Sequence, residues 1–398
     1  HIGSAYTTII ADTIARWHRL KGEDVFFLTG LDENSSKTVE AAKKIMVYDI
    51  KKYTDMMAEQ WQKAWKMLNI SNDDFIRTTE ERHKQFVIKF FNKVDKKKDI
   101  YKGKYTGYYC NGCEAYKTEK ELTNGKCPIH QTTARSISEQ NYFFKLSKYK
   151  NKILKYIKSN PNFIYPENRR NEMINILEEG LHDLSISRPN LKWGIQVPID
   201  KEHYFWVWFD ALLNYLSANE KLWPADLQLM GKDILKFHAI IFPGMLISAG
   251  YKLPKKIAAH GFLTINGQKM SKSLGNAIDP IFLVNKYGSD ALRYSLIKDI
   301  PFGQDGDFSE RLLVERINNE LANDLGNLVS RASAMIDQYF NGTLLKGIVS
   351  REIKNELDLK KINSYMDNLE LHHAIAEIWS FIKAVNKYIN DKQPWEIA

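Results

Sequence analysis

The first hydrophobic pattern in the chain has a helical period. Over residues 5–21 apolar side chains recur every three or four positions, and Gly22 follows as a stop signal. This apolar face consists of Ile10, Ile14, Trp17 and Leu20. The apolar run 25–28 then predicts a short buried strand ending at Thr29-Gly30, and residues 41–69 again favour helices. A helix followed by a strand is half of a βαβ unit, so the pattern predicts an α/β body with a parallel sheet.

The middle of the chain changes character and then returns to apolar runs. Residues 93–104 are basic and only weakly apolar, and we interpret residues 101–200 as an insertion. After Pro198, apolar runs reappear at 204–209 and 234–246. Residues 262–269 predict a hairpin, because Asn266-Gly267 favours the tight primed turn between two strands.

The last part of the chain has helical periodicity alone. From Ser309 onward, apolar residues recur at intervals of three and four, which predicts a helical bundle. The two apolar stripes are Leu313, Ile317, Leu321, Leu325, Leu328 and Ala332, and then Leu371, Ile375, Ile378, Ile382, Val385 and Ile389. The sequence therefore predicts four segments: a first half of the α/β core (1–100), the insertion (101–200), a second half of the core (201–308) and an all-α domain (309–398).

Composition narrows the class of protein. The chain has 398 residues, of which 44% are hydrophobic and 26% charged, values typical of a folded protein of two to four domains. No apolar run is long enough to span a membrane, so we predict no membrane partner. The net charge of +9 favours an anionic partner without identifying one. Three cysteines in a chain this long indicate a reducing, cytoplasmic location rather than a disulfide framework. The sequence leaves the oligomeric state open.

All three cysteines fall in one short stretch that ends at a histidine. Cys110 and Cys113 are separated by two residues, as are Cys127 and His130, with 13 residues between the two pairs. Three thiolates and one imidazole at this spacing match a closed tetrahedral zinc site. Buried free thiols beside an unrelated histidine are the alternative, but they do not explain the paired spacing. The sequence therefore predicts one structural Zn²⁺ ion.

Two elements suit the binding of phosphate groups. The stretch from His1 to Ser4 opens a helix, where exposed amides attract anions and Gly3 allows close approach. The stretch from Lys269 to Ser273 places two lysines three residues apart in a loop between Gly267 and Gly275. Taken alone, such a loop is more often a solvated basic segment. Together the two elements indicate a nucleotide site.

These two elements resemble the HIGH and KMSKS motifs of the class I aminoacyl-tRNA synthetases. Lys269 to Ser273 matches the second motif residue for residue. Within this class the chain resembles the methionine-specific family nearly end to end. The stretches that carry this resemblance are Phe27–Glu33, the cysteine cluster, Tyr204–Tyr215, Gly231–His238, Pro301–Ser309 and Gln393–Ala398.

The resemblance implies a Rossmann-like catalytic core with a zinc-knuckle insertion, followed by an anticodon-binding bundle. It also implies a reaction: methionine and ATP form methionyl adenylate, and methionine is then transferred to tRNA(Met) for translation initiation and elongation. Mg²⁺ would accompany ATP. In this interpretation His1, Lys269 and Lys272 are the catalytic residues, and the two lysines bind the triphosphate oxygens. The residues implied for ATP binding are His1, Gly3, Ser4, Gly231, His260, Gly261, Lys269 and Lys272.

The resemblance also implies a methionine pocket and an anticodon site. Asp32 would bind the ammonium group, and a thioether side chain has to be selected by shape and polarizable contact. The residues implied for the pocket are Asp32, Trp208, Ala211, Leu212, Tyr215 and His238, with Arg188 and Asp233 as further polar groups. A structural ion pair is the alternative for Arg188 and Asp233, and a core role is the alternative for Trp208 and His238. In the bundle, Asn327, Arg331 and Trp395 match anticodon-reading positions on a polar stripe that begins at Asn319 and Asn323.

The chain departs from the family pattern at three places. Ser4 stands where the HIGH motif often ends in histidine, and Asn34-Ser35 stands where the family usually has His-Gly. The chain begins at His1, and we expect an upstream strand that contributes to the amino-acid pocket.

Two rival interpretations remain. One is a class I synthetase for leucine, isoleucine, valine or cysteine. Only 268 positions separate His1 from Lys269, which leaves no room for the large editing insertion of the first three, and a closed zinc site does not suit the cysteine enzyme. The other is a zinc-containing tRNA-binding module without catalysis, which the intact Lys269 and Lys272 disfavour.

Overall fold

The computed structural model describes residues 2–110, 112, 115–129, 131–189, 191–270, 276–344 and 346–397. The chain folds into two compact units. Unit 1 combines residues 1–22, 64–70 and 260–398, and unit 2 combines residues 23–63 and 71–259. Each unit is therefore built from segments that lie far apart in the sequence. Across the described residues, no helix has both the length and the apolarity needed to cross a membrane.

Unit 2 begins with a pair of parallel strands. Strand β1 (Leu28–Leu31) pairs with β2 (Asp74–Arg77), and α2 (Ser36–Lys44) and α3 (Ile50–Met67) follow β1 in the chain. The strand predicted at residues 25–28 thus lies three residues later than expected. The Phe27 amide donates to the Asp73 carboxylate at 2.6 Å, and the ladder with β2 begins one residue later, at Leu28.

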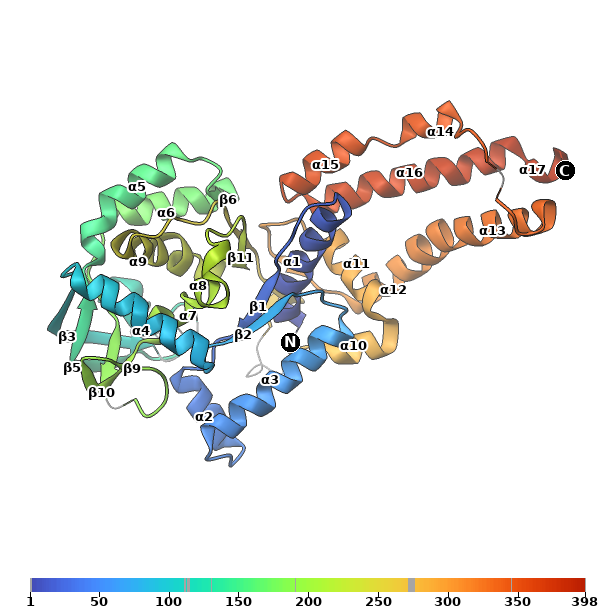
Figure 1. Cartoon of the computed structure of the whole chain (residues 1–398). Helices are drawn as coiled ribbons and strands as arrows, with labels where there is room; N and C mark the ends of the chain where they lie inside the picture. The colour runs from blue at the N-terminus through green and yellow to red at the C-terminus, as the bar shows by residue number, and fades with distance from the viewer. Residues whose placement is uncertain are drawn as a thin grey trace. The chain divides into compact units, whose positions relative to one another are not determined.

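A second parallel pairing lies among helices of unit 2. Strands β11 (Gln228–Gly231), β12 (Ile257–His260) and β6 (Ile164–Tyr165) form one sheet, in which β12 and β6 run parallel. Figure 1 shows α5 (Lys150–Ser159), α6 (Glu167–Glu179) and α9 (Phe242–Ala249) grouped near β6. The apolar core of the unit joins α4 (Glu81–Lys96), α9 and the 205–216 region in one cluster. Parallel strands with helices agree with the predicted α/β class.

The cysteine-containing stretch forms a different kind of sheet. Strands β3 (Ile100–Cys110) and β5 (Arg135–Phe144) make a long antiparallel ladder, flanked by β4 (Ala115–Lys117) and β7 (Leu184–Ser185). A smaller antiparallel sheet contains β8 (Ser187–Pro189), β10 (Asp200–Phe205) and β9 (Gln196–Val197). Two short helices, α7 (Val207–Ala211) and α8 (Asn214–Ala218), follow β10. The predicted domain boundaries at 100 and 200 stay a prediction.

Unit 1 contains the predicted first helix and the predicted hairpin. Helix α1 covers Ile2–Leu20, and Gly22 ends the turn after it with φ +80°. Strands β13 (Leu263–Ile265) and β14 (Gln268–Lys269) form the hairpin. Asn266 and Gly267 both have positive φ, +52° and +73°, as a primed turn requires. Strand β15 (Gly306–Asp307) adds to β13 in parallel, and α10 (Pro280–Tyr287) and α11 (Ser289–Asp299) lie between them in the sequence.

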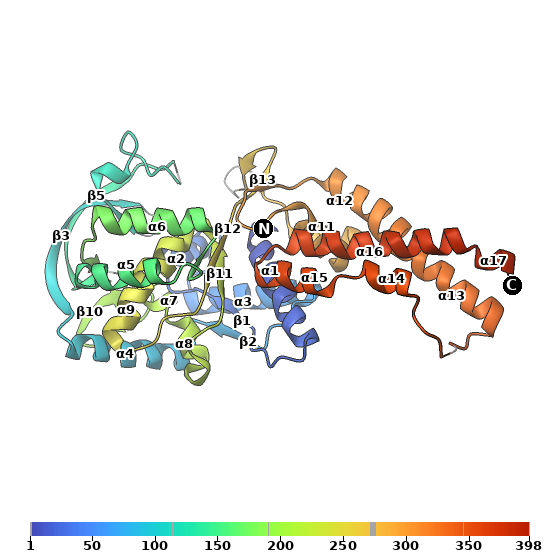
Figure 2. The ribbon, with the colours of Figure 1, turned by 90° about the horizontal axis from the view of Figure 1, so that it is seen from above.

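The chain after Ser309 is helical, as the apolar stripes predict. Its elements are α12 (Glu310–Arg316), the π-helix η7 (Ile317–Gly326), α13 (Asn327–Phe340), α14 (Arg351–Glu356), α15 (Leu359–Asp367), α16 (Leu371–Lys392) and α17 (Pro394–Ile397). Helices α14 and α15 lie along α16, against which η7 and α13 also pack (Figures 1 and 2). The apolar stripe from Leu313 to Ala332 passes through the wider π turns of η7. Apolar spacing does not distinguish these from α turns.

Candidate active site

The residues predicted for ATP and for methionine divide between the two units. Gly3, Ser4, His260, Gly261 and Lys269 belong to unit 1. Unit 2 contains Gly231 and the residues predicted for methionine. His1 and Lys272 lie outside the described residues, as do Cys113 and His130 of the predicted zinc site.

The start of α1 has the features of an anion-binding helix end. Gly3 and Ser4 lie in its first turn, which contains no acidic residue. The Ile2 amide donates to the carbonyl of Ile278 at 2.9 Å, which fixes the position of the helix start. The first amides of a helix have no acceptor within the helix and carry its positive dipole end. This turn can therefore receive a phosphate oxygen.

His260 is buried beside the same helix. Its Nε2 lies 2.6 Å from the Thr7 hydroxyl oxygen, and its Nδ1 lies 2.7 Å from the Gly261 carbonyl oxygen. Because a carbonyl oxygen only accepts, Nδ1 carries a hydrogen. Tyr6 packs edge-on against the ring at 5.1 Å. Both ring nitrogens are thus occupied within the protein, and a direct contact of His260 with adenosine stays a prediction.

Gly261 has a packing reason to be glycine. A Cβ built on it would lie 2.1 Å from the carbonyl oxygen of Gln304. The backbone at residues 304–305 therefore approaches the Gly261 backbone closely, just before β15 pairs with β13. Its predicted contact with ATP remains a prediction beside this structural role.

The hairpin carries the first lysine of the KMSKS motif. Lys269 ends β14 opposite Thr264, and Met270 is buried directly after it. Asp307 secures the turn, because its Oδ1 accepts from the Gly267 amide at 2.9 Å and from the Thr264 hydroxyl at 2.7 Å. The Gly267 amide, followed by the Thr264 hydroxyl, lowers the pKa of Asp307. Sequence reasoning missed Asp307 as an individual residue, although it lies inside the matching stretch Pro301–Ser309.

Asp32 lies at the carboxyl end of a parallel strand. It is exposed and directly follows β1. The next residue, Glu33, is buried and accepts from Arg77 Nε at 2.9 Å, which ties the segment to the end of β2. Open α/β sheets bind ligands beyond the carboxyl ends of their strands. The Asp32 carboxylate is therefore placed where a cationic group of a ligand can reach it.

The structure brings together Trp208, Tyr215 and His238, three residues predicted for the methionine pocket. Trp208 stacks on Phe237 with ring centroids 3.9 Å apart and planes 5° from parallel. His238 contacts Trp208 edge-on at 6.4 Å and Tyr215 edge-on at 5.7 Å. Phe237 was not singled out from the sequence, although it precedes His238 in the matching stretch. The four rings make an aromatic cluster that suits an apolar, polarizable side chain.

A π-helix positions two of these rings. Phe237 and His238 begin the π-helical segment η5 (Phe237–Ile241), which continues into α9. Single π turns inside helices are uncommon and occur frequently at functional sites. The wider turn changes the direction of the side chains relative to α9.

The protonation state of His238 follows from its partners. Its Nδ1 lies 3.0 Å from the Ile234 carbonyl, so this nitrogen donates. Burial lowers the pKa of His238 to about 4, so the ring is neutral near pH 7 and Nε2 accepts. The Tyr215 hydroxyl, 2.8 Å away, must then donate to Nε2. The phenolic oxygen keeps its lone pairs available, so it can accept a further hydrogen bond.

Four other residues predicted for the active site lie at the end of α7 and at the start of the segment 231–234. Ala211 ends α7 and is 7% exposed, whereas Leu212 is 1% exposed and belongs to the apolar core. Gly231 caps a short 3-10 helix, η4 (Lys232–Ile234), on which Asp233 is exposed.

The guanidinium group of Arg188 lies among aromatic rings. Its guanidinium carbon is 4.1 Å from the centroid of Tyr116 and 5.7 Å from that of Trp206. Its Nη1 donates to the Ser187 carbonyl at 2.7 Å and to the Ser185 hydroxyl at 3.1 Å. These contacts link the 115–117 strand to the start of α7. They give Arg188 a structural role beside the active-site role predicted for it.

The described part of the cysteine cluster contains two buried thiols. Cys110 and Cys127 are both fully buried and neither forms a disulfide. Thr132 contacts both cysteine residues: its Oγ1 lies 3.9 Å from Cys110 Sγ, and its carbonyl accepts from the Cys127 amide at 2.9 Å. The Gln131 amide donates to the Cys127 carbonyl at 2.8 Å.

The residues predicted for the anticodon lie on α13 and α17. Asn327 and Arg331 are one turn apart on α13, and Asn319 and Asn323 precede them on η7, exposed as predicted. Arg331 donates to Asn390 Oδ1 at 2.7 Å and lies 5.8 Å from the ring centroid of Trp395. Trp395 is 44% exposed. The structure thus places Arg331 beside an aromatic ring that a base can contact.

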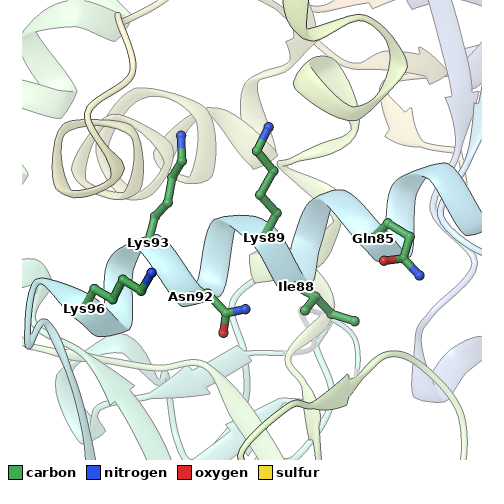
Figure 3. Close-up of a pocket in the computed structure, with 6 residues that line it drawn as sticks. All are labelled: Gln85, Ile88, Lys89, Asn92, Lys93 and Lys96. Carbon is green, nitrogen blue, oxygen red and sulfur yellow. The ribbon is translucent and has the colours of Figure 1, made fainter.

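A shallow groove of about 420 Å³ runs along the outer face of α4 (Figure 3). It contains none of the residues predicted for ATP or methionine. Its lining residues are Gln85, Ile88, Lys89, Asn92, Lys93 and Lys96. Lys89 pairs with Glu220 at 2.7 Å, and Lys93 lies over the Tyr251 ring, so both have partners within the protein.

The fold and the two motifs correspond to a known class of enzymes. A family model described as "tRNA synthetases class I (M)" matches residues 1–137 and 117–333. Similar proteins include the methionine–tRNA ligases of Thermotoga maritima and Caldanaerobacter subterraneus. These are 50% and 47% identical to the chain over 414 residues, covering 99% and 100% of it and 66% and 65% of the relatives. The chain belongs to the methionine-specific family of class I tRNA synthetases.

Solved structures agree with this assignment. Mycobacterium tuberculosis methionyl-tRNA synthetase in complex with methionyl-adenylate is 40% identical, with a TM-score of 0.95 over 99% of this chain and 81% of that one. The apo form of the same enzyme gives a TM-score of 0.84. The chain spans about two thirds of the length of the Thermotoga and Caldanaerobacter relatives.

Proposed function

We propose that this protein is a methionine–tRNA ligase, which activates methionine with ATP and transfers it to tRNA(Met). The observation that carries the proposal is the aromatic cluster of Trp208, Phe237, His238 and Tyr215. It occurs in a chain 40% identical to an enzyme whose structure was solved with methionyl-adenylate.

The proposed activation step joins the methionine carboxylate to the α-phosphorus of ATP. One carboxylate oxygen forms the new P–O bond while the bond to pyrophosphate breaks. The protein has to align the reactants and stabilise charge on the phosphate oxygens. The first turn of α1 and the ammonium groups of Lys269 and Lys272 supply positive charge for this purpose, and Mg²⁺ accompanies ATP. His1, Gly231, His260 and Gly261 complete the proposed ATP site.

The proposed amino-acid site uses charge at one end and shape at the other. Asp32 binds the ammonium group, because it is an exposed carboxylate at the end of β1. The aromatic cluster binds the thioether, since sulfur makes favourable contacts with ring edges and faces. Ala211 and Leu212, at the end of α7, are the further apolar residues proposed for the site, and Arg188 and Asp233 are its further polar groups.

The proposed tRNA site lies on the bundle. Exposed amides on η7 and α13 can hydrogen-bond to base edges, and Trp395 offers a ring on which an unpaired base can stack. Asn327, Arg331 and Trp395 are the proposed anticodon-binding residues. We also propose that the protein is located in the cytoplasm.

The described residues fit a structural zinc ion. Two fully buried thiols, in two segments that Thr132 contacts together, are typical of a small fold that encloses a metal. Cys110, Cys113, Cys127 and His130 would hold the ion. The ion would crosslink the two segments that contain these residues and would take no part in the reaction. The predicted zinc content is one ion per chain, and Cys110→Ala should lose it and lower the melting temperature of the protein.

The catalytic proposal is tested by replacing the second lysine of the KMSKS motif. Lys272→Ala should slow methionine-dependent ATP–pyrophosphate exchange by about 10²–10³-fold, the usual effect of losing one charge-stabilising donor. Lys255→Ala is the control, because Lys255 is an exposed lysine that pairs with Asp226 on the surface. Exchange by Lys272→Ala at the rate of this control would contradict the proposed role.

A further inference from the structure

A chain of buried polar side chains runs through unit 2 next to the proposed methionine site. Asn34 donates from Nδ2 to Asp210 Oδ2 at 3.0 Å, and His83 Nε2 lies 3.0 Å from Asp210 Oδ1. His83 Nδ1 lies 2.8 Å from the Ser217 hydroxyl oxygen. His83 and Asp210 are fully buried, and Asn34 is 2% exposed. We refer to these four residues as the Asn34–Ser217 network.

The hydrogen-bonding groups of this network have partners within the network or among nearby backbone carbonyls. Asn34 Nδ2 also donates to the carbonyl of Thr78 at 3.0 Å, so both of its N–H groups are used. The Ser217 hydroxyl donates to the Asn214 carbonyl at 3.2 Å, which leaves its lone pairs facing His83. A buried carboxyl group without partners is costly, so each member depends on the others. The network therefore has one preferred arrangement.

The network joins the two ends of the proposed amino-acid site. Asn34 is two residues after Asp32, the proposed ligand of the ammonium group. Asp210 lies on α7 between Trp208 and Ala211, and Ser217 lies on α8 with Tyr215. His83, on α4, bridges the two short helices. Helices of five residues have little stability of their own, so their position depends on such contacts.

A second contact strengthens the link to the Asp32 segment. The Glu33 amide donates to the Thr78 hydroxyl at 2.9 Å, and the Trp193 indole donates to the Glu33 carbonyl at 2.8 Å. The backbone on both sides of Glu33 is thus fixed at the end of β2. Asn34 is then the side chain that extends from this fixed segment to α7.

We propose that Asn34, Asp210 and His83 are positioning residues that set the separation between Asp32 and the aromatic cluster, and thereby the fit of methionine. The proposal rests on the proposed function. Asparagine suits this position, because its amide can donate to Thr78 and Asp210 at once. In this proposal none of the four residues touches methionine or ATP. The network acts through the residues beside it.

The test compares steady-state constants for pyrophosphate exchange in variants of the full-length protein. Asn34→Ala and Asn34→Asp both remove the donors, and the second keeps the shape of the side chain. Each should raise the KM for methionine about tenfold. The KM for ATP should stay within twofold, and kcat at saturating methionine within threefold. Ser217→Ala removes only the outer contact and should raise the KM for methionine two- to threefold.

The matched control removes a hydrogen bond from another buried network of the same unit. Ser248 donates to Asp99 at 2.7 Å, and Ser248→Ala should leave the KM for methionine unchanged. An unchanged methionine KM in folded Asn34 variants contradicts the positioning role, as does an equal rise in Ser248→Ala. If the Asn34 variants do not fold, an unchanged KM in Ser217→Ala contradicts it. Failure of the wild-type protein to activate methionine would instead contradict the proposed function.

Discussion

At the scale of single residues, His238 shows how burial sets a chemical state. It is 3% exposed, and desolvation lowers its pKa to about 4 from an ordinary value of 6.5. The unfolded chain therefore binds a proton at this residue below pH 6.5, whereas the folded protein resists doing so. The stabilising contribution is complete above pH 6.5 and declines as the pH falls toward 4.

This effect predicts how the free energy of unfolding depends on pH. Acidification from pH 7 to pH 4 should cost the wild-type protein about 3 kcal/mol through His238 alone. His238→Gln removes the titrating group, so the difference in stability between wild type and variant should shrink as the pH falls. Denaturant unfolding at both pH values measures this difference. A difference that is constant with pH would show that His238 does not titrate as described.

Phe237 gives a second prediction at this scale. Its ring stacks on Trp208 at 3.9 Å, and such pairs contribute about 0.5–1.5 kcal/mol beyond their buried area. Phe237→Leu keeps apolar volume but loses the stacking, so we expect the KM for methionine to rise about three- to tenfold. Pyrophosphate exchange at varied methionine measures it. Phe282→Leu, at an exposed phenylalanine of unit 1, is the control and should match wild type.

At the scale of elements, the hairpin of β13 and β14 depends on one carboxylate. Asp307, from β15, holds both the Gly267 amide and the Thr264 hydroxyl. Lys269 ends the hairpin and is the first residue of the KMSKS motif, so the geometry of the hairpin determines the position of Lys269. Met270, directly after the hairpin, is buried.

Removing this carboxylate should affect ATP more than methionine. Asp307→Ala is expected to raise the KM for ATP or lower kcat about tenfold, because the turn before Lys269 loses two hydrogen bonds. The KM for methionine should remain within twofold of wild type. Asp226→Ala, at a surface aspartate paired with Lys255, controls for the loss of a negative charge. Equal kinetics in the two variants would show that Asp307 does not position the motif.

The bundle helices support a prediction about tRNA. Arg331 is held by Asn390 and lies beside Trp395, so either Arg331→Ala or Trp395→Ala should weaken contact with anticodon bases. Base–aromatic stacking is worth about 1–3 kcal/mol, which corresponds to a rise in the KM for tRNA of about 5- to 150-fold. Pyrophosphate exchange, which needs no tRNA, should be unchanged. Arg311→Ala, at an arginine 80% exposed, is the control.

Two results of this experiment would contradict anticodon recognition by Arg331 and Trp395. If both variants charge tRNA(Met) with the wild-type KM, the polar stripe on η7 and α13 is a solvated face. If exchange falls together with charging, the substitutions act on the fold rather than on recognition.

At the scale of the whole molecule, features that depend on neighbouring residues could be predicted from the sequence better than features that depend on contacts between distant residues. The Asn266-Gly267 turn was predictable because its positive φ angles depend on two adjacent residues. The position of β1 was not, because it depends on pairing with β2 and on a hydrogen bond from the Phe27 amide to Asp73, 46 residues away. The π turns at η5 and η7 were also missed, since they leave the apolar spacing almost unchanged. The α/β class and the helical C-terminal segment needed only periodicity.

The same distinction applies to the candidate site. Motif resemblance identified Trp208, Tyr215 and His238, and the structure brings their rings together. It did not identify Phe237, Asp307 or the Asn34–Ser217 network, because these residues act through partners that only folding brings close. Asp210 is an example: it lies inside a matching stretch, but its partners His83 and Asn34 are more than 100 positions away.

The central claim is that the chain selects methionine for activation. Amino-acid-dependent ATP–pyrophosphate exchange by the full-length protein tests it most directly, with methionine compared against leucine, isoleucine, valine and cysteine. We predict that kcat/KM for methionine exceeds that of each competitor by at least about 100-fold, near the upper limit of discrimination that differences in apolar fit can supply. Exchange that methionine does not stimulate above the other four amino acids would contradict the account.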